Sequence, residues 1–275
     1  LPHLALPWGG TDAEHDAGVL RYVRVEYAAR GLELGGVGRG TAVDFVQVRK
    51  AGDNCLRLRG GTVRAKHLLC QYPGDEMVEI SEGYDGELQY LVGQRTPIRD
   101  RERNGLLIEG ARAVVTNATF CGSDVTNDSF AFVARSGASL SLTNAIALGF
   151  GAGLDVQGAP ASLEVRGVTF HRLHAGVLAH AESAAVTDPA SLRYDDDRGF
   201  DEVAFLGAAA RANTLADPGL ASCLDPDAPS FAPAATLPGL TLPASVFLDG
   251  AATFRGAATA GDGWATAPWT VWSAR

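Results

Sequence analysis

The chain has 275 residues, of which 46% are apolar, and it carries a formal net charge of −9 with a pI of about 5.1. An all-β chain of this length commonly folds as one domain with a sizeable core. Nucleic-acid binding draws most of its affinity from basic side chains that neutralise phosphates. Here Arg and Lys are scattered among acids, so the composition argues against a nucleic-acid partner.

The chain contains no apolar run that approaches the roughly 18–20 residues needed to cross a bilayer, so no transmembrane span is predicted. It starts at Leu1 rather than at Met, and it lacks a charged and then apolar leader. We expect that a signal segment has been removed and that the sequence belongs to a longer, exported chain.

Two strand types alternate along the first two thirds of the sequence. Longer strands rich in β-branched residues are predicted at residues 22–27, 43–49, 67–70, 115–121, 142–148 and 165–170. Shorter strands follow at residues 31–36, 55–61, 77–80, 130–133, 153–156 and 176–179. The unit recurs every 22–27 residues or so, which is a solenoid period, and one phrase, Thr116-Asn117-Ala118, nearly repeats as Thr143-Asn144-Ala145.

Each unit alternates apolar and polar residues with period 2, and no helical pattern separates the strands. The pattern predicts an all-β fold, a right-handed parallel β-helix, in which stacked coils bury one another's apolar faces. A two-sheet sandwich is the structural alternative. We expect the β-helix to occupy residues 1–185 and residues 186–275 to form an irregular C-terminal segment of the same domain that packs along it or caps it.

The C-terminal segment loses the repeat and holds three of the four tryptophans, Trp264, Trp269 and Trp272. We expect these to cover apolar surface of the solenoid, with an exposed aromatic platform for a ligand as the alternative. Asp195-Asp196-Asp197 leads into a short helix predicted within residues 200–212. Such a run is more typical of a helix cap than of a cation site.

Four cysteines, Cys55, Cys70, Cys121 and Cys223, show neither a CxxC motif nor a Cys/His metal spacing. An even count predicts one or two disulfides in an oxidising compartment, with three possible full pairings. Buried free thiols are the alternative.

Several phrases of the sequence resemble a group of bacterial surface proteins, the right-handed β-helix (pectin-lyase-like) lipoproteins found in myxobacteria and Bacteroidetes. They are WGGTD at 8–12, GVLRYVRVEYA at 18–28, GLELGGVG at 31–38, GGTVRAKHL at 60–68, GYDGELQY at 83–90, FRGA at 254–257 and DGWA at 262–265. The resemblance implies export, a secreted or outer-membrane location at the cell surface, and a β-helix. It implies no activity, because the group is largely uncharacterised.

The acidic stretch of Asp75, Glu76, Glu79, Glu82 and Asp85 offers oxygen ligands of the kind that Ca²⁺ requires. A calcium site is therefore predicted at Asp75, Glu76, Glu79 and Glu82. No EF-hand loop or nonapeptide repeat supports it, and a solvated turn and strand face is the alternative. No other cofactor is expected.

Two groups of residues are candidates for cleaving a polysaccharide on a face of the β-helix, one by a lyase reaction and one by hydrolysis. A lyase needs a base and a cation or Arg that neutralises a uronate, and the basic residues near one another in sequence are Arg57, Arg59, Arg64, Lys66 and His67. A glycoside hydrolase needs two carboxylates on neighbouring coils. The conceivable acids are Asp44, Asp53, Asp75 and Asp155.

No recognisable catalytic constellation stands out, so the catalytic residues are unknown. We interpret the chain as an exported, non-catalytic structural, adhesive or assembly component of the bacterial cell surface, whose partner is a surface glycan or a protein of a larger assembly. The alternative is a polysaccharide-active enzyme, a lyase before a hydrolase, which rests on fold analogy.

Overall fold

The computed structural model describes residues 9–95, 104–124, 129–160, 162–174, 176, 178–189 and 191–273. Trp8, which opens the first phrase of the family resemblance, lies outside them. Within the described residues strands predominate and helices are short. The elements in chain order are β1 Val19–Glu26, β2 Leu32–Gly35, β3 Ala42–Arg49, β4 Leu56–Arg59, β5 Arg64–Gln71, β6 Val78–Ser81, β7 Asp85–Gln94, β8 Leu106–Glu109, β9 Arg112–Cys121, β10 Phe130–Arg135, β11 Ser139–Leu148, β12 Ala152–Gln157, β13 Ser162–Arg166, β14 Thr169–His171, α1 Glu202–Gly207, the 3-10 turn Ala209–Arg211, β15 Thr214–Leu215 and the 3-10 turn Trp264–Thr266.

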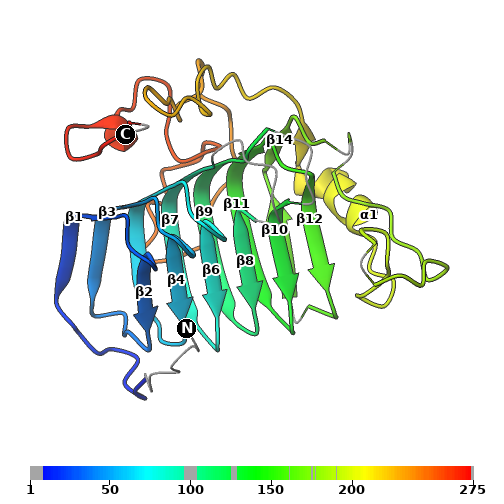
Figure 1. Ribbon diagram of the computed structural model, residues 1–275, viewed down its shortest axis with the longest axis horizontal. Helices are drawn as coiled ribbons and strands as arrows, with labels where there is room; N and C mark the ends of the chain where they lie inside the picture. Colours follow the sequence, from blue (N-terminus) through cyan, green and yellow to red (C-terminus); the bar gives the residue numbers. More distant parts are fainter. Residues whose placement is uncertain are drawn as a thin grey trace.

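The strands form two sheets in which strands from successive coils are parallel neighbours (Figure 1). Sheet A has the order β1-β3-β5-β7-β9-β11-β14-β15, with β13 also beside β11, and sheet B has the order β2-β4-β6-β8-β10-β12. Every pairing between these strands is parallel. The fold is therefore the expected parallel β-helix, and the two-sheet antiparallel sandwich is wrong.

The predicted repeat length is confirmed by the register of the coils. Ala42 pairs with Arg64, an offset of 22 residues, and Thr116 pairs with Thr143, an offset of 27 residues. Inward-facing side chains consequently form columns that fill the interior between the sheets. One column in sheet A is Val43, Ala65, Leu88, Val115, Leu142 and Val165, and one in sheet B is Leu58, Ile80, Ile108, Ala134 and Val156, all of them buried.

Sheet A bends at one column of residues that adopt a left-handed backbone conformation. Their φ angles are +49° to +63°, and the ladder pairing skips them. This conformation is uncommon outside glycine, although Asn tolerates it better than most residues. The column is Tyr22, Phe45, His67, Tyr90, Asn117 and Asn144. The repeated Thr-Asn-Ala phrase thus marks the same corner in two successive coils.

The aromatic members of this corner column stack on one another. The ring of Phe45 lies 4.8 Å from that of Tyr22 and 4.2 Å from that of His67, and His67 lies 4.9 Å from Tyr90. Trp264 packs edge-on against His67, and Trp269 packs edge-on against Tyr22 and Phe45. Trp264 and Trp269, which are half-buried, therefore cover the outside of the corner, whereas Trp272 packs against Phe231.

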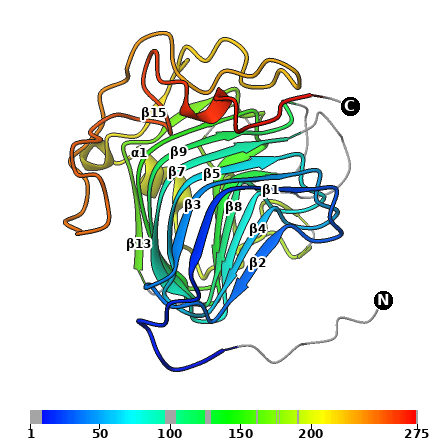
Figure 2. The same cartoon turned by 90° about the vertical axis from the view of Figure 1, so that its left-hand side faces the viewer.

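The C-terminal segment runs along the outside of sheet A, where Figure 2 shows it in orange and red. It has little regular structure, so its backbone groups need partners from the sheet. Gln47 and the backbone of Val271 exchange two hydrogen bonds of 2.9 Å. Gln94 donates to the carbonyls of Cys223 and Asp225 at 3.0 and 2.8 Å.

The asparagines of the corner column bind the same segment further along. Asn144 exchanges two hydrogen bonds of 2.7 Å with the backbone of Leu240, and Asn117 donates to the carbonyls of Ala252 and Phe254 at 3.0 and 2.8 Å. Both asparagines are fully buried. Buried amides on the outer face of sheet A thus replace the hydrogen bonds that a neighbouring strand would make.

All four cysteines form disulfides, which confirms the disulfide prediction and resolves the pairing. Cys55 pairs with Cys70 across a separation of 15 residues, and Cys121 at the end of β9 pairs with Cys223 in the C-terminal segment across 102 residues. The second disulfide is therefore a covalent link between the β-helix and the segment that covers it.

Two local predictions differ from the structure. The helix expected within residues 200–212 is shorter, because α1 ends at Gly207 and a 3-10 turn follows. Its cap is Asp201, whose side chain accepts from the backbone N–H of Ala204 at 2.8 Å, rather than the preceding Asp run. The strand expected at 176–179 is not formed in the described residues 176 and 178–179, although the carbonyl of Leu178 accepts from Gly153 at 2.8 Å.

Among the described residues, no helix combines the length and the apolar character that crossing a bilayer would require.

The Cys121–Cys223 link makes a prediction about the C-terminal segment. A C121S/C223S variant is expected to lose about 2–5 kcal/mol of unfolding free energy, because the disulfide closes a long loop. Urea unfolding measures this loss, and limited proteolysis is expected to cut first within residues 214–273. A C55S/C70S variant serves as the control, since its loop is short and lies within the coils. Equal resistance of the segment to proteolysis in both variants would contradict the assigned role.

Candidate functional site

The outer face of sheet B presents side chains in two ladders. One ladder contains Glu33, Arg57, Glu79, Leu107, Val133 and Asp155, and the other contains Arg59, Ser81, Glu109, Arg135 and Gln157. Because neighbouring strands lie roughly 4.8 Å apart, each residue lies beside its counterparts in the adjacent coils. The strand alternation that buries the core column therefore also aligns charged groups on the outside.

These ladders and the turn before β6 form a depression that we call the polar groove. Its volume is about 350 Å³, within the range of small-molecule sites. The lining residues are Arg57, Asp75, Glu76, Glu79, Asn104, Leu107, Phe130, Val133, Arg135, Asp155 and Gln157.

Arg57 and Glu79 form the central ion pair of one end of the polar groove. The Arg57 guanidinium donates to Glu79 Oε2 through Nε at 2.8 Å and through a terminal nitrogen at 2.7 Å. Asn54 and Ser81 also donate to the Glu79 carboxylate, Ser81 at 3.1 Å. Asp53 lies 3.6 Å from the same guanidinium. These contacts fix the Glu79 carboxylate in place.

The middle of the polar groove is apolar. Leu107 and Val133 are ladder neighbours, and they form a cluster with Phe130 and Ala152 against which Leu192 packs. On the far side, Arg135 donates to Glu109 at 2.9 Å, and Gln157 donates to Asp155 at 2.8 Å. The buried Nε of Arg135 has no hydrogen-bond partner, so this guanidinium retains an unused donor. The groove is thus mainly polar, with a small apolar area between its two polar ends.

Glu76 is the groove residue with the most perturbed ionisation. Burial, with a smaller contribution from the neighbouring Asp75, raises the pKa of Glu76 to about 7, while Arg95 opposes the shift. Asn104 donates to Glu76 at 3.2 Å, and the Glu76 N–H donates to Asn54 at 2.9 Å. A carboxyl group that is half protonated near neutral pH can donate or accept a proton.

The four residues of the calcium hypothesis occupy different surroundings. Asp75 and Glu76 lie in the turn before β6, and Glu79 points outward from β6 to Arg57. Glu82 follows β6 and pairs with Arg59, which also contacts Glu33 at 2.8 Å. Three of the four line the polar groove and Glu82 does not. A calcium site on this stretch stays a prediction.

The basic residues suggested for a lyase are divided between the two sheets. Arg57 and Arg59 lie on sheet B, whereas Arg64 and Lys66 lie on β5 of sheet A, 5.2 and 4.8 Å from the ring centre of Phe247. His67 lies in the corner column, and its Nδ1 is 2.7 Å from Asp44. Burial lowers the pKa of His67, although the hydrogen bond with Asp44 acts in the opposite direction. The lowered pKa favours the neutral ring.

The acids suggested for a hydrolase are likewise separated. Asp75 and Asp155 line the polar groove, whereas Asp44 pairs with Arg21 on sheet A. The sequence reasoning missed Asn104 and Arg135 as groove residues. The alternation of apolar and polar residues predicts that Arg135 points outward from its strand. It does not predict that Arg135 lies beside Glu109, because that requires the register between the two coils. Asn104 lies in a turn, where the alternation carries no information.

The model of the pectate-lyase-like β-helix domain matches residues 4–201. That is more than two thirds of the chain, and it spans both ladders of sheet B. The chain belongs to the pectate-lyase-like β-helix family. No curated protein and no solved structure matches it significantly. A pectate-lyase-like β-helix domain fits a polysaccharide-active enzyme and a structural role equally well, so membership does not decide between them.

The Glu76 environment predicts a pH dependence of stability. Since the pKa of Glu76 is raised above its value in the unfolded chain, the folded state binds this proton more tightly. Stability should therefore fall as the pH rises from about 4.5 to about 7, by an amount on the order of 2 kcal/mol. Urea unfolding of a Glu76→Gln variant is expected to show a shallower decline across this interval than the wild type.

Glu164→Gln, on the exposed side of β13, is the control for the Glu76 measurement and should keep the wild-type slope. Identical pH profiles for the Glu76→Gln variant and the wild type would contradict the assigned environment.

Proposed function

We propose that the polar groove of sheet B binds a neutral polysaccharide, and that the protein is an exported, non-catalytic adhesive or structural component of the bacterial cell surface. The observation that carries the proposal is the composition of the groove. A small apolar area at the largely buried Leu107 and Val133 lies between two sets of hydrogen-bonding groups centred on Glu79 and Arg135.

A sugar ring requires both kinds of surface. Its hydroxyl groups match carboxylate, amide and guanidinium partners, and its C–H faces match an apolar floor. Specific pockets in general combine an apolar lining with a few placed polar groups. Repetition of the ladders from coil to coil extends this arrangement along the axis, which suits a polymer better than a single small ligand.

The charge of the groove favours a neutral glycan over a polyuronate. Asp75, Glu76, Glu79 and Asp155 face two guanidinium groups, those of Arg57 and Arg135. With Glu76 partly protonated, the acids still outnumber the bases, and the whole chain has a net charge of −9. A polyanion would be repelled from such a surface unless cations intervened.

The export part of the proposal is supported by the two disulfides, which form and persist in oxidising compartments. The family resemblance of the sequence to bacterial surface lipoproteins agrees with it. Labelling of intact cells of the source organism with an antibody against the protein tests the location.

A second candidate function, hydrolysis of a polysaccharide, is favoured by the raised pKa of Glu76. A glycoside hydrolase requires one protonated carboxyl group as the acid and one ionised carboxylate as base or nucleophile. Glu76 fits the first role, and Asp155 or Glu79 fits the second. The excess of acids in the groove supports a hydrolase more than a lyase, which has to accommodate a uronate.

Binding to a panel of neutral polysaccharides, measured by affinity electrophoresis and calorimetry, tests the proposed function. We expect at least one neutral glycan to bind and polyuronates to bind more weakly. Arg135→Ala should weaken binding about tenfold or more, because it removes a charged donor from the groove. Arg112→Ala is the matched control, since Arg112 also pairs with one carboxylate of the preceding coil but lies on sheet A. Equal effects of the two substitutions would contradict binding in the groove.

Release of reducing ends from the bound glycan separates the two candidate functions. The adhesive function predicts binding without product. Product that disappears in the Glu76→Gln variant while binding persists would establish the hydrolase instead.

A further inference from the structure

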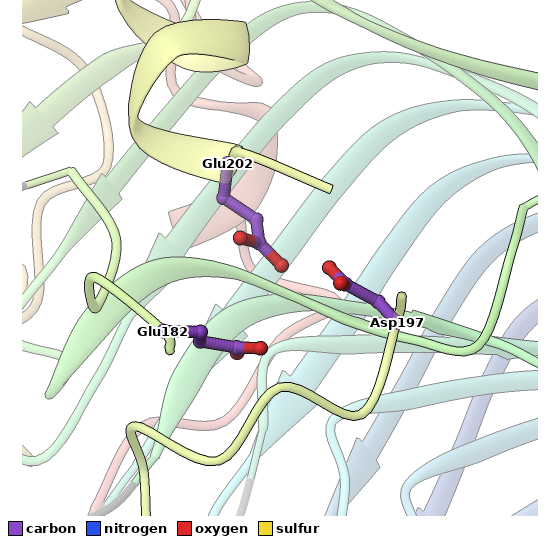
Figure 3. A group of neighbouring side chains, drawn as sticks. All are labelled: Glu182, Asp197 and Glu202. Carbon is purple, nitrogen blue, oxygen red and sulfur yellow. The ribbon is translucent and has the colours of Figure 1, made fainter. Parts of the chain in front are cut away.

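Three carboxylates converge at the end of the β-helix, remote in sequence from the ladders of sheet B. One ligand oxygen each from Glu182, Asp197 and Glu202 lies within 4.8 Å of the other two. Figure 3 shows the three carboxylate groups pointing toward one another. Glu182 comes from the loop after β14, Asp197 from the loop before α1, and Glu202 from the first turn of α1.

Two of these side chains are almost completely buried. Asp197 is 3% exposed and Glu202 is 2% exposed. Asp197 Oδ1 accepts from the backbone N–H groups of Gly199 and Phe200 at 2.9 and 2.8 Å, but Oδ2 faces the cluster and has no hydrogen-bond partner. Glu182 Oε2 is likewise buried without a partner. Buried polar atoms are normally satisfied, so these two oxygens call for a ligand.

No basic side chain in the described part of the chain neutralises the cluster, and burial together with the neighbouring Asp197 and Glu182 raises the pKa of Glu202 to about 9. No Lys, Arg or His there lies within ion-pair distance of Glu182, Asp197 or Glu202. Burial is the largest cause that raises the pKa of Glu182 to about 7, and the neighbouring acids Asp197, Asp155 and Asp196 contribute to the same shift. Buried charges are normally paired or coordinated to a metal, and an unpaired group is costly.

We propose that Glu182, Asp197 and Glu202 form a calcium site that fastens the loops beyond β14 to the last coil of the β-helix. The remaining ligands would be waters, for which the adjoining pocket of about 500 Å³ lined by Glu182, Asp195 and Glu202 provides room. Glu202 Oε1 also accepts from the backbone N–H of Val156 at 3.3 Å, so the site is tied directly to β12.

The donor set selects calcium among common metals. All ligand atoms are carboxylate oxygens, which hard cations prefer, whereas Zn²⁺ sites are built mainly from His and Cys. Mg²⁺ demands near-ideal octahedral geometry and keeps several waters. Two of the carboxylates come from the irregular connection between β14 and α1 and the third from the first turn of α1, an arrangement that suits the variable coordination of Ca²⁺.

A bound cation at this position would stabilise the end of the solenoid. The last coil has no further coil to cover its strand edges, and such edges need protection. The three ligand residues belong to segments that fold over this end, next to β12 (Figure 1). The three ligand residues are not among those that line the polar groove, although Asp155 of the groove lies close enough to act on Glu182. The test therefore measures Ca²⁺ binding and Tm, which do not depend on the proposed glycan binding.

Calorimetric titration of the chelator-treated protein with CaCl₂ tests the proposal, together with thermal unfolding in CaCl₂ and in EDTA. We expect one Ca²⁺ per chain and a rise in Tm of roughly 5 °C at saturating Ca²⁺, with a smaller rise for Mg²⁺. Asp197→Asn and Glu202→Gln should each weaken Ca²⁺ binding at least tenfold. Glu14→Gln, which removes an exposed carboxylate before β1 and far along the chain from the cluster, should bind as the wild type does.

The order of stability of the wild type and the Glu202→Gln variant should reverse between EDTA and CaCl₂ if the cluster binds a cation. A purely structural role predicts the same order in both. In EDTA the Glu202→Gln variant should be at least as stable as the wild type, because burial and the neighbouring acids already disfavour the ionised form of Glu202, and glutamine is neutral as well. In CaCl₂ it should be less stable than the wild type. The proposal is overturned if the wild type shows neither binding heat nor a Tm rise, or if both variants keep wild-type Ca²⁺ affinity.

Discussion

The structure depends on parallel strands that stack in register, so that each residue pairs with a residue one coil away. Coil lengths differ, as the offsets of 22 and 27 residues show, yet the pairing resumes in each new coil. The extra residues are placed in turns, which keeps the apolar columns of the interior continuous. Register also holds at the corner column, whose six members, one in each coil, all adopt the left-handed conformation. A shift of one residue would exchange the buried and exposed faces of a strand.

The same register creates two different outer faces of the molecule. On sheet A it aligns Arg49, Gln71 and Gln94 into a buried ladder, in which Arg49 donates to Gln71 at 3.1 Å and Gln71 donates to Gln94 at 3.0 Å. This ladder, the corner asparagines and the Cys121–Cys223 disulfide bind the C-terminal segment, so sheet A is covered. On sheet B the outward ladders carry the groove between the Arg57–Glu79 and Arg135–Glu109 pairs. One physical rule therefore produces a covered face on sheet A and a face with a polar groove on sheet B.

Features that show in the strand repeat or in one local stretch of residues could be predicted from the sequence, whereas features that depend on backbone angles or on irregular loops could not. The β-helix was predictable because strands such as β3 and β11 alternate apolar and polar residues at a solenoid period. Asp75, Glu76 and Glu79 were identifiable because they form a local acidic stretch. The corner column was missed, since Phe45 and His67 resemble ordinary strand residues until their φ angles are known. The cluster of Glu182, Asp197 and Glu202 lies in irregular loops, where no period relates one residue to the next.

The register on sheet B can be measured directly with engineered cysteine pairs, because all native cysteines are in disulfides. Glu109 and Arg135 are register partners on the exposed face, whereas Glu109 and Val133 are offset by two residues. The offset pair has Cα atoms roughly 8 Å apart, beyond the reach of a disulfide. Mild oxidation of the Glu109→Cys/Arg135→Cys variant is expected to consume both new thiols within one chain, and the Glu109→Cys/Val133→Cys variant should keep them. Equal oxidation of both pairs, or preferential oxidation of the offset pair, would contradict the in-register stack.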